Sequence, residues 1–330
     1  MILVCGAGGF IGGHLVRKLL DDGKTVRAVD KKPKTEWYQL HDEAQNIVLD
    51  LSDEANCRLA CNGVDEVYQL AADMGGMGFI EKFRIECMRS VLINVHMLES
   101  AQKAGVKKYF YSSSACAYNV DKQQEVTSRG LKESDAYPAN AERGYGWEKL
   151  YSEMLGQEYV AERGMEVYIA RFHNVYGPNG TWRGGREKAP AALCRKVATV
   201  VETEGSSMEV WGDGKRVRTY MFIDDCIMGI QKIMGCSKLI GKPINLGSEE
   251  RMSVDGMIDE IESAAGICGI NRVYQPDAPK GVVGRASDNT MIREILGWEP
   301  STSFHDGIKI TYDWIHQQVI NSRSGKKVLD

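Results

Sequence analysis

The chain has 330 residues, which is enough for a sizeable hydrophobic core and for two lobes. Its 41 Lys and Arg residues stand against 45 Asp and Glu residues, and the formal net charge of -4 excludes the strongly basic surface of a general nucleic-acid binder. With 43% hydrophobic residues, 35 Gly and 8 Pro, the composition is that of neither a disordered nor a fibrous protein.

Short β-branched or aromatic runs alternate with longer helical patterns in the first half of the chain. These runs predict strands at Ile2–Cys5, Thr25–Val29, Ile47–Leu49, Glu66–Leu70 and Lys108–Tyr111. Strands that alternate with helices are typical of a parallel sheet covered by helices on both faces. The sequence therefore predicts an α/β fold with a Rossmann-type, doubly wound parallel sheet.

Apolar residues at helical spacing predict which faces of the intervening helices cover this sheet. The two faces consist of Ile11, Leu15, Leu19 and Leu20, and of Leu92, Val95, Leu98 and Ala101. We expect both faces to be buried.

In the second half of the chain, a helix is predicted from Tyr145 to about Glu162. A strand is predicted at Glu166–Ala170, and two more, near Thr219–Ile223 and at Pro243–Leu246, are expected to return to the main sheet.

Three features complete this half of the chain. The segment Thr181–Lys188 is rich in Gly and charge, which is typical of an ordered loop over a site. The amphipathic segment Ile308–Ile320 predicts a last helix, and the residues after about Ser322 are expected to form a solvated tail.

No run approaches the roughly 18 uninterrupted apolar residues of a membrane-spanning helix, and Met1 leads into a short apolar stretch without a charged leader. We therefore expect a soluble, cytoplasmic protein. The nine Cys residues lack the paired spacing of a zinc site, so we expect no metal and predict that most of them are reduced and buried.

Three glycines, Gly6, Gly9 and Gly12, follow the first predicted strand and lead directly into a helical pattern, with Phe10 and Ile11 between the last two. Glycine at these places allows a tight turn, close approach of a pyrophosphate and close packing of the helix on its strand. The helix N-terminus then attracts the anion. The pattern predicts a dinucleotide site, and the alternative is a simple glycine-rich turn.

Asp30 lies at the end of the second predicted strand, where a carboxylate can accept hydrogen bonds from ribose hydroxyls and repel a 2'-phosphate. This favours NAD over NADP, although Lys31 and Lys32 would attract that phosphate. Asp50 closes the third predicted strand and is a candidate for the adenine edge; helix capping is the alternative.

Tyr145 and Lys149 lie one turn apart on the same helix face, and Ser114 ends the run of serines after the strand at Lys108–Tyr111. A cation beside a phenol is expected to lower the pKa of Tyr145, which could then take a proton from a sugar hydroxyl. The alternative is a surface pair. The glycine loop, these residues and the segment Arg171–Pro178 resemble the extended short-chain dehydrogenase/reductase family. The resemblance implies a triad of Ser114, Tyr145 and Lys149 acting with NAD.

Further segments resemble the GDP-mannose 3,5-epimerases within that family. They are Ser114–Cys116, Ala71–Gly78, Arg171–Asn174, Gly184–Pro190 and Gly284–Asn289. The resemblance implies oxidation of C4 of the hexose of GDP-mannose to a ketone, which acidifies the C–H bonds at C3 and C5. It further implies that Cys116 is the base and Lys188 the acid that invert these centres before C4 is reduced again. The product would be GDP-L-galactose, with GDP-L-gulose as the alternative product.

The same resemblance implies a set of substrate-binding residues. They are Gly75, Ser114, Cys116, Asn174, Glu187, Lys188, Ala189, Lys196, Arg216, Arg218 and Arg285. Of these, the cations Lys196, Arg218 and Arg285 would neutralise the diphosphate. Taken singly, Cys116 has the alternative of a buried filler, Lys188 of a solvated loop charge, and Asn174 of a turn residue.

This organisation predicts two lobes. Residues 1–177, with about 219–247, are expected to form the NAD-binding domain. Residues 178–218 and 248–330 are expected to form a smaller C-terminal α/β substrate lobe.

The family also implies a homodimer, formed through helices near Asn94–Ala104 and Gly146–Glu162. The alternative functions are another nucleotide-sugar 4-epimerase, a 4,6-dehydratase, or a non-catalytic NAD sensor.

Overall fold

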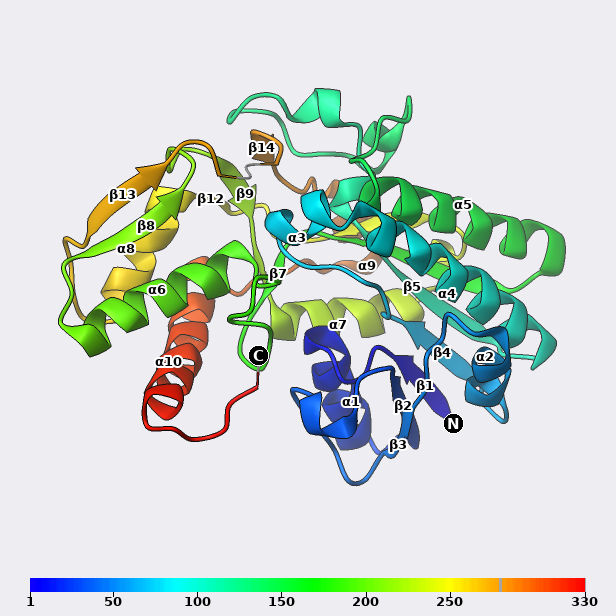
Figure 1. Ribbon diagram of the computed structural model, residues 1–330. Coiled ribbons are helices and arrows are strands. Elements are labelled where there is room, and N and C mark those ends of the chain that lie inside the picture. The colour runs from blue at the N-terminus through cyan, green and yellow to red at the C-terminus, as the bar shows by residue number, and fades with distance from the viewer. Residues whose placement is uncertain (279–280, 330) are drawn as a thin grey trace.

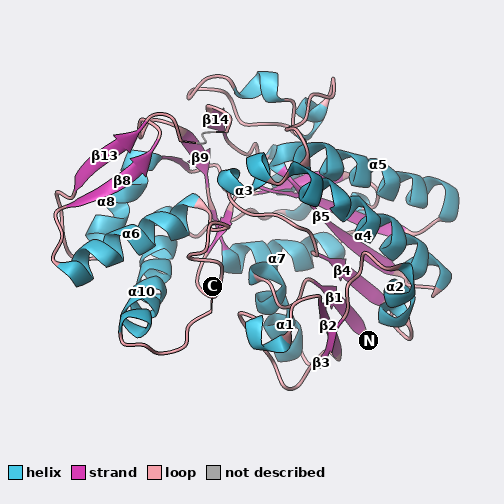
Figure 2. Ribbon diagram, in the orientation of Figure 1, coloured by secondary structure: helices cyan, strands magenta, loops and turns pink. Residues whose placement is uncertain are grey.

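The computed structural model describes residues 1–278 and 281–329, and its centre is a parallel sheet of seven strands (Figure 2). The strands are β1 (Ile2–Cys5), β2 (Val26–Asp30), β3 (Gln45–Val48), β4 (Glu66–Gln69), β5 (Lys108–Ser114), β6 (Glu166–Phe172) and β11 (Pro243–Leu246). Their order is β11-β6-β5-β4-β1-β2-β3, and all neighbours are parallel. This confirms the predicted Rossmann-type sheet. The strand order reverses at β1 and β4, where such sheets bind ligands beyond the carboxyl ends of their strands.

Helices cover both faces of this sheet because alternate strand residues point to opposite sides (Figure 1). Ile2 and Val4 of β1 belong to the same core cluster as Leu15 of α1. Leu3 and Cys5 belong instead to a cluster with α2 and α4. The helices of the two faces are α1 (Phe10–Asp21) and α7 (Ile223–Met234) on one side, and α2 (Glu54–Cys61), α4 (Arg84–Lys103) and α5 (Tyr145–Arg163) on the other.

The predicted face of α4 is only partly correct. Leu98 and Ala101 are buried, but Leu92 is 40% exposed. The buried stripe passes through polar Asn94, whose side chain donates hydrogen bonds to Glu148 and to Ser152 of α5 at 2.7 and 3.0 Å. A pattern of apolar residues alone could not identify a helix face that is buried through hydrogen bonds.

The prediction that a strand near Thr219–Ile223 joins the main sheet is wrong. This segment is split into β9 (Val217–Thr219), which lies in a three-stranded sheet with β12 (Arg251–Ser253) and β14 (Gly284–Arg285), and β10 (Met221–Phe222), which pairs with β7 (Val175–Tyr176). Helix α7 already begins at Ile223, where two acidic residues in its first turn favour a helix N-terminus. The strand predicted at Pro243–Leu246 does join the main sheet.

A smaller group of elements packs beside the sheet, on the left in Figure 1. There α6 (Ala189–Thr203), α8 (Val254–Ala264) and α10 (Phe304–Arg323) pack against one another, and β8 (Ser207–Trp211) pairs in parallel with β13 (Asn271–Gln275). The remaining elements are α3 (Met77–Lys82), α9 (Thr290–Leu296) and the 3-10 helices η1 (Lys34–Glu36), η2 (Ala115–Ala117), η3 (Val120–Gln123), η4 (Glu133–Ala136) and η5 (Ser237–Leu239).

The segment after α10 differs from the expected solvated tail. Val328 packs against the main core cluster, and the carbonyl of Leu329 accepts a hydrogen bond of 2.8 Å from Nε1 of Trp182.

All nine cysteines are free. Seven of them are buried, Cys236 is half-buried and Cys268 is exposed. Within residues 1–278 and 281–329, no helix has the length and hydrophobicity needed to cross a membrane.

Candidate active site

A cavity of about 560 Å³ opens at the carboxyl edge of the sheet. The glycine loop, the ends of β2 to β5, the start of α5 and the loop before α6 all line it. Of the residues singled out in the sequence, the cavity brings together Gly6, Gly9, Phe10, Ile11, Gly12, Asp30, Asp50, Gly75, Ser114, Tyr145 and Lys188.

The glycine loop has the backbone that a dinucleotide cradle needs. Gly6 has a φ of +78°, and a Cβ on Gly12 would lie 2.1 Å from the carbonyl oxygen of Gly6. Gly9 caps α1 without a side-chain hydrogen bond, and the first turn of α1 contains no acidic residue. The first amides of α1 are therefore open to an anion, and the loop fits the pyrophosphate of NAD.

Asp30 and its two lysine neighbours form the far end of this cavity. The carboxylate of Asp30 accepts hydrogen bonds of 3.0 Å from the backbone amides of Gly8 and Lys32. Lys31 pairs with Asp73 at 2.7 Å, and the ammonium group of Lys32 donates to the carbonyl of Gly8 at 3.1 Å. Both cations thus have partners within the protein, which favours NAD at this end.

Asp50 both lines the cavity and stabilises a local turn. Its Oδ1 accepts hydrogen bonds from the backbone amide and the hydroxyl of Ser52, and these bonds lower the pKa of Asp50. The N-cap of α2 is Asp53, so Asp50 itself is not the helix cap.

Tyr145 lies at the first position of α5, beside Ser114 at the end of β5. The ammonium group of Lys149 is 5.2 Å from the centre of the Tyr145 ring and 3.3 Å from Oε2 of Glu148. Burial, followed by repulsion from Cys116 and Glu148, raises the pKa of Tyr145 well above its usual value. We predicted that Lys149 would lower the pKa of Tyr145, and this is wrong for the present arrangement. Burial raises the pKa of Tyr145, and the carboxylate of Glu148 offsets the charge of Lys149. The side chains of Glu148 and Lys149 are each 1% exposed.

Cys116 lies in η2, and the hydroxyl of Ser114 accepts a hydrogen bond of 3.2 Å from its backbone amide. Its sulfur is 3.5 Å from Nη1 of Arg285, which forms an ion pair with Glu142. Burial is the main cause that raises the pKa of the Cys116 thiol. Cys116 belongs to the same apolar cluster as Tyr145, and of these two residues Tyr145 lines the cavity.

Lys188 is the N-cap residue of α6 and is half-buried in the cavity wall. Loss of water around its ammonium group lowers the pKa of Lys188, and the proximity of Cys116 opposes this shift. The loop before it approaches Gly76 closely, since a Cβ there would lie 2.4 Å from the carbonyl oxygen of Glu187. Lys188 is therefore an amine of reduced basicity held near a thiol.

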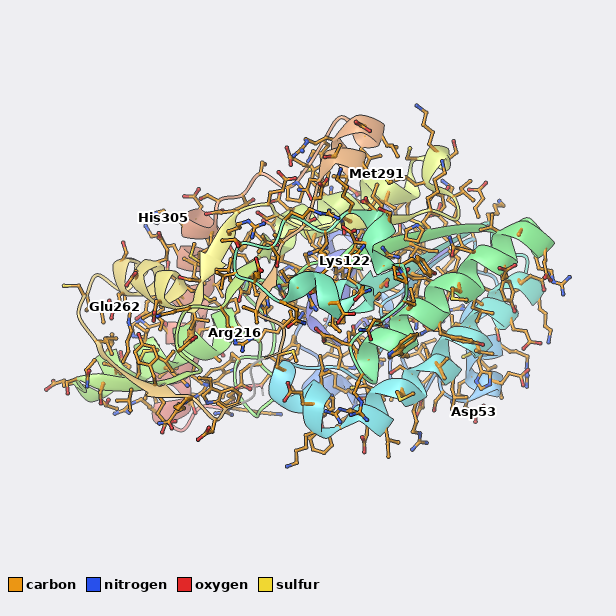
Figure 3. All side chains as sticks on the ribbon, turned by 90° about the horizontal axis from the view of Figure 1, so that it is seen from above. Asp53, Lys122, Arg216, Glu262, Met291 and His305 are labelled. Carbon is orange, nitrogen blue, oxygen red and sulfur yellow. The ribbon has the colours of Figure 1, made fainter. Side chains whose placement is uncertain are left out.

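The predicted cations of the substrate site donate mainly to protein carbonyls. Arg216 donates to Gly281 and Val282 at 2.8 and 2.9 Å, and Arg218 donates to Val283 at 3.1 Å. Arg216 lies on the same side of the molecule as Glu262 of α8, while Asp53 of α2 lies at the opposite end (Figure 3). Lys196 donates to the carbonyl of Glu209 at 2.8 Å.

The other predicted substrate residues also have partners in the protein. Asn174, at a φ of +33°, donates to the carbonyl of Thr219 at 3.0 Å. Glu187 pairs with Arg195 at 3.0 Å, and Ala189 is the first residue of α6. None of Cys116, Lys149, Asn174, Glu187, Ala189, Lys196, Arg216, Arg218 and Arg285 is among the described residues that line the cavity.

Two sets of contacts at this site were not predicted from the sequence: those around Arg285 and those of Arg186. Glu142 and Gln123 both contact Arg285, although they lie far from it in the chain. Arg186 lies over the ring of Phe79 at 3.9 Å and pairs with Asp73 at 3.4 Å, which ties the loop before α6 to the end of β4. Pairs so distant in sequence give no local signal, and the position of Glu142 three residues before Tyr145 is the one feature of the sequence that could have indicated it.

Comparisons with known proteins agree with this geometry. Residues 2–247 match the NAD dependent epimerase/dehydratase family. The chain is 43% identical to GDP-mannose 3,5-epimerase 1 of Oryza sativa subsp. japonica over 322 residues, which covers 96% of this chain and 82% of the relative.

Two solved structures also resemble this fold. One is UDP-glucose 4-epimerase of Thermotoga maritima with UDP-glucose, at a TM-score of 0.84 and 25% identity, covering 96% of this chain and 99% of the other. The other is UDP-glucuronic acid 4-epimerase of Bacillus cereus with UDP-glucuronic acid and NAD, at a TM-score of 0.82, 25% identity and the same coverage.

Proposed function

The chain belongs to the NAD-dependent epimerase/dehydratase family, and we propose that it epimerises GDP-mannose at C3 and C5. The observation that carries this proposal is the meeting of a dinucleotide loop, Ser114 and Tyr145 with Lys188 in one cavity. Cys116 packs in the same apolar cluster as Tyr145 and is near enough to Lys188 to affect its pKa. The 43% identical relative with this activity supports the choice of substrate.

The glycine loop and Asp30 would hold NAD, with Asp50 toward the adenine and Tyr145 and Lys149 toward the nicotinamide. Bound NAD would supply a reversible hydride acceptor for C4 of the sugar, so the reaction would have no net redox change. Tyr145 takes the proton of the C4 hydroxyl, and Ser114 holds the C4 oxygen. Lys149, 5.2 Å from the centre of the Tyr145 ring, is proposed to orient Tyr145 and the nicotinamide, since its ion pair with Glu148 offsets its charge at the phenol.

Cys116 and Lys188 exchange the protons at C3 and C5. A C4 ketone makes both C–H bonds acidic, because each carbanion delocalises onto the carbonyl oxygen. Cys116 removes a proton as the thiolate and Lys188 returns one from the opposite face, which inverts the centre. Burial lowers the pKa of Lys188, which makes its ammonium group a better proton donor.

The smaller lobe, residues 178–218 and 248–330, would bind GDP-mannose against the NAD-binding domain of residues 1–177 and 219–247. Lys196, Arg218 and Arg285 are proposed to neutralise the diphosphate. Burial lowers the pKa of Arg218 to about 10, so a nearby anion would relieve an unfavourable buried charge. Gly75, Asn174, Glu187, Ala189 and Arg216 complete the proposed substrate site.

We also propose a homodimer through α4 and α5. Both helices expose apolar residues at helical spacing, namely Ile85, Met88 and Leu92 on α4 and Trp147, Tyr151 and Met154 on α5. A second copy could bury this face, and light scattering at a monomer mass would contradict it. The nine free cysteines support a reducing, cytoplasmic location.

Incubation with GDP-mannose in heavy water tests the function. The proposal predicts deuterium at both C3 and C5, with GDP-L-galactose and GDP-L-gulose as candidate products by NMR. Uptake at neither carbon rejects it. A 4-epimerase or 4,6-dehydratase would give a different product, and a dehydratase would normally carry an acidic pair where Ala115 and Cys116 stand. Unchanged turnover in Tyr145→Phe would favour an NAD sensor.

A further inference from the structure

Arg285 of β14 has its guanidinium held from three directions. It forms an ion pair with Glu142 through Nη2, and Nε donates to Oε1 of Gln123 at 2.5 Å. The remaining nitrogen, Nη1, lies 3.5 Å from the sulfur of Cys116. Arg285 is 5% exposed, so this orientation is fixed by contacts inside the protein.

Glu142 is fixed to Cys116 by the backbone as well. Its amide donates a hydrogen bond of 3.1 Å to the carbonyl of Cys116. Gly146 keeps the start of α5 close to this pair, because a Cβ there would lie 2.2 Å from the carbonyl oxygen of Cys116. The carboxylate, the guanidinium and the sulfur therefore form one buried cluster, made from the loop before α5, β14 and η2.

The charges in this cluster oppose one another. Burial and the negative charge of Glu142 raise the pKa of Cys116, while Arg285 lowers it. Burial raises the pKa of Glu142, but Arg285 outweighs this and leaves the carboxyl below its usual pKa, so Glu142 is charged. Within the described residues, the other titratable groups that face the cluster include Lys188, Tyr145, Cys87 of α4, Arg218 of β9 and His173, which lies near Arg285.

We infer that Glu142 is a positioning residue for Cys116: it holds the guanidinium of Arg285 against the sulfur and, by neutralising that cation, keeps the resting sulfur a thiol. A thiol at rest resists oxidation and alkylation better than a thiolate does. The inference deepens the proposed function and rests on it for the role of Cys116 in catalysis. The electrostatic arrangement itself does not depend on any substrate.

The test is a titration of the Cys116 thiolate by ultraviolet absorbance. The spectrum of the matched Cys116→Ser variant is subtracted, so the other cysteines cancel. Glu142→Gln keeps the shape and an acceptor for Nη2 of Arg285, but it removes the negative charge. We expect the midpoint to move to lower pH by about one unit or more, the usual effect of a charge within about 4–6 Å. A midpoint that is unmoved or higher overturns the inference.

Two further variants make the result specific. Glu142→Asp keeps the charge and should return the midpoint toward that of the unaltered protein. Glu202→Gln removes a carboxylate that pairs with His316 in the smaller lobe, and it should leave the midpoint unchanged.

If Glu142→Gln does not fold, Arg285→Lys gives an independent result. The midpoint should rise in this variant, because a lysine cannot hold an N–H donor on the sulfur while it pairs with Glu142.

Deuterium exchange separates this inference from the proposed function. If both hold, the acidic limb of the exchange rate at C3 and C5 moves to lower pH in Glu142→Gln, in step with the thiolate titration. If the unaltered protein exchanges no deuterium into GDP-mannose, the proposed function fails, while the titration still decides the role of Glu142. If exchange occurs but its acidic limb stays in place in Glu142→Gln, the role assigned to Glu142 in catalysis is wrong.

Discussion

A methyl group added at Gly12 should weaken NAD binding before it unfolds the protein. The added Cβ of Gly12→Ala would lie 2.1 Å from the carbonyl oxygen of Gly6 and 2.9 Å from the Cα of Ala7. Ordinary contacts begin near 3.4 Å, so the loop and the start of α1 must separate by about 1 Å. Both obstacles are backbone atoms, and no side-chain rotation can relieve the overlap.

Overpacking of this kind costs about 1–3 kcal/mol. The displaced atoms belong to the cradle expected to contact the pyrophosphate, so most of that cost should appear in binding. This corresponds to an increase in the Kd for NAD of about 10-fold to 100-fold. The assay is calorimetric titration of cofactor-depleted protein with NAD, with thermal unfolding followed in parallel.

Gly235→Ala is the matched control. Gly235 follows α7 with a φ of -83°, and a Cβ there would come no closer than 3.4 Å to its neighbours. It should leave the Kd for NAD unchanged. If Gly12→Ala binds NAD as tightly as the control, the loop does not hold the cofactor as described.

Three other predictions concern cofactor choice and stability. Asp30→Ser should raise the affinity for NADP relative to NAD, measured as the ratio of the two Kd values, because it removes the carboxylate that repels a 2'-phosphate; an unchanged ratio would place the ribose elsewhere. Glu153→Gln should lower the free energy of unfolding by about 3–5 kcal/mol in a denaturant titration, because Arg171 would keep an unopposed buried charge. Arg171 is 2% exposed and pairs with Glu153 at 2.6 Å. A loss below about 1 kcal/mol would contradict this. Burial lowers the pKa of His173 from 6.5 to about 3 in the folded protein. Between these two pH values the imidazole is protonated in the unfolded chain but not in the folded one. The free energy of unfolding therefore falls as the pH falls, by up to about 1.4 kcal/mol per pH unit. Unfolding of His173→Asn should show a shallower loss between pH 6.5 and pH 5, and equal slopes in both proteins would refute the assignment.

The sequence predicted the parts of the site that depend on local structure. A buried strand that ends in Gly6, Gly9 and Gly12 leaves few backbone conformations, and the structure has the strand, the turn and the helix where they were predicted. Asp30 and Ser114 follow for the same reason, because the carboxyl ends of parallel strands meet at one edge.

The parts that the sequence could not predict depend on partners distant in the chain. Lys149 was expected to lower the pKa of Tyr145, but the adjacent Glu148 is turned inward and pairs with it. No signal in the sequence indicated that Arg285 forms an ion pair with Glu142 and contacts the sulfur of Cys116. The tail after α10 has a polar composition, yet Val328 and Leu329 reach Trp182 and the core. Composition reports the average polarity of such a segment and cannot show which carbonyl meets which donor.

The central claim is that a thiol and an amine exchange protons with a sugar whose C4 is transiently oxidised. The most direct measurement follows deuterium at C3 and C5 of GDP-mannose in heavy water with Cys116→Ser and Lys188→Met, while absorbance reports reduction of the bound NAD. We predict that both variants still reduce NAD in the presence of GDP-mannose, and that deuterium uptake at both carbons falls by about 100-fold or more, the usual contribution of a general acid or base. Uptake at an unreduced rate in either variant would contradict the account.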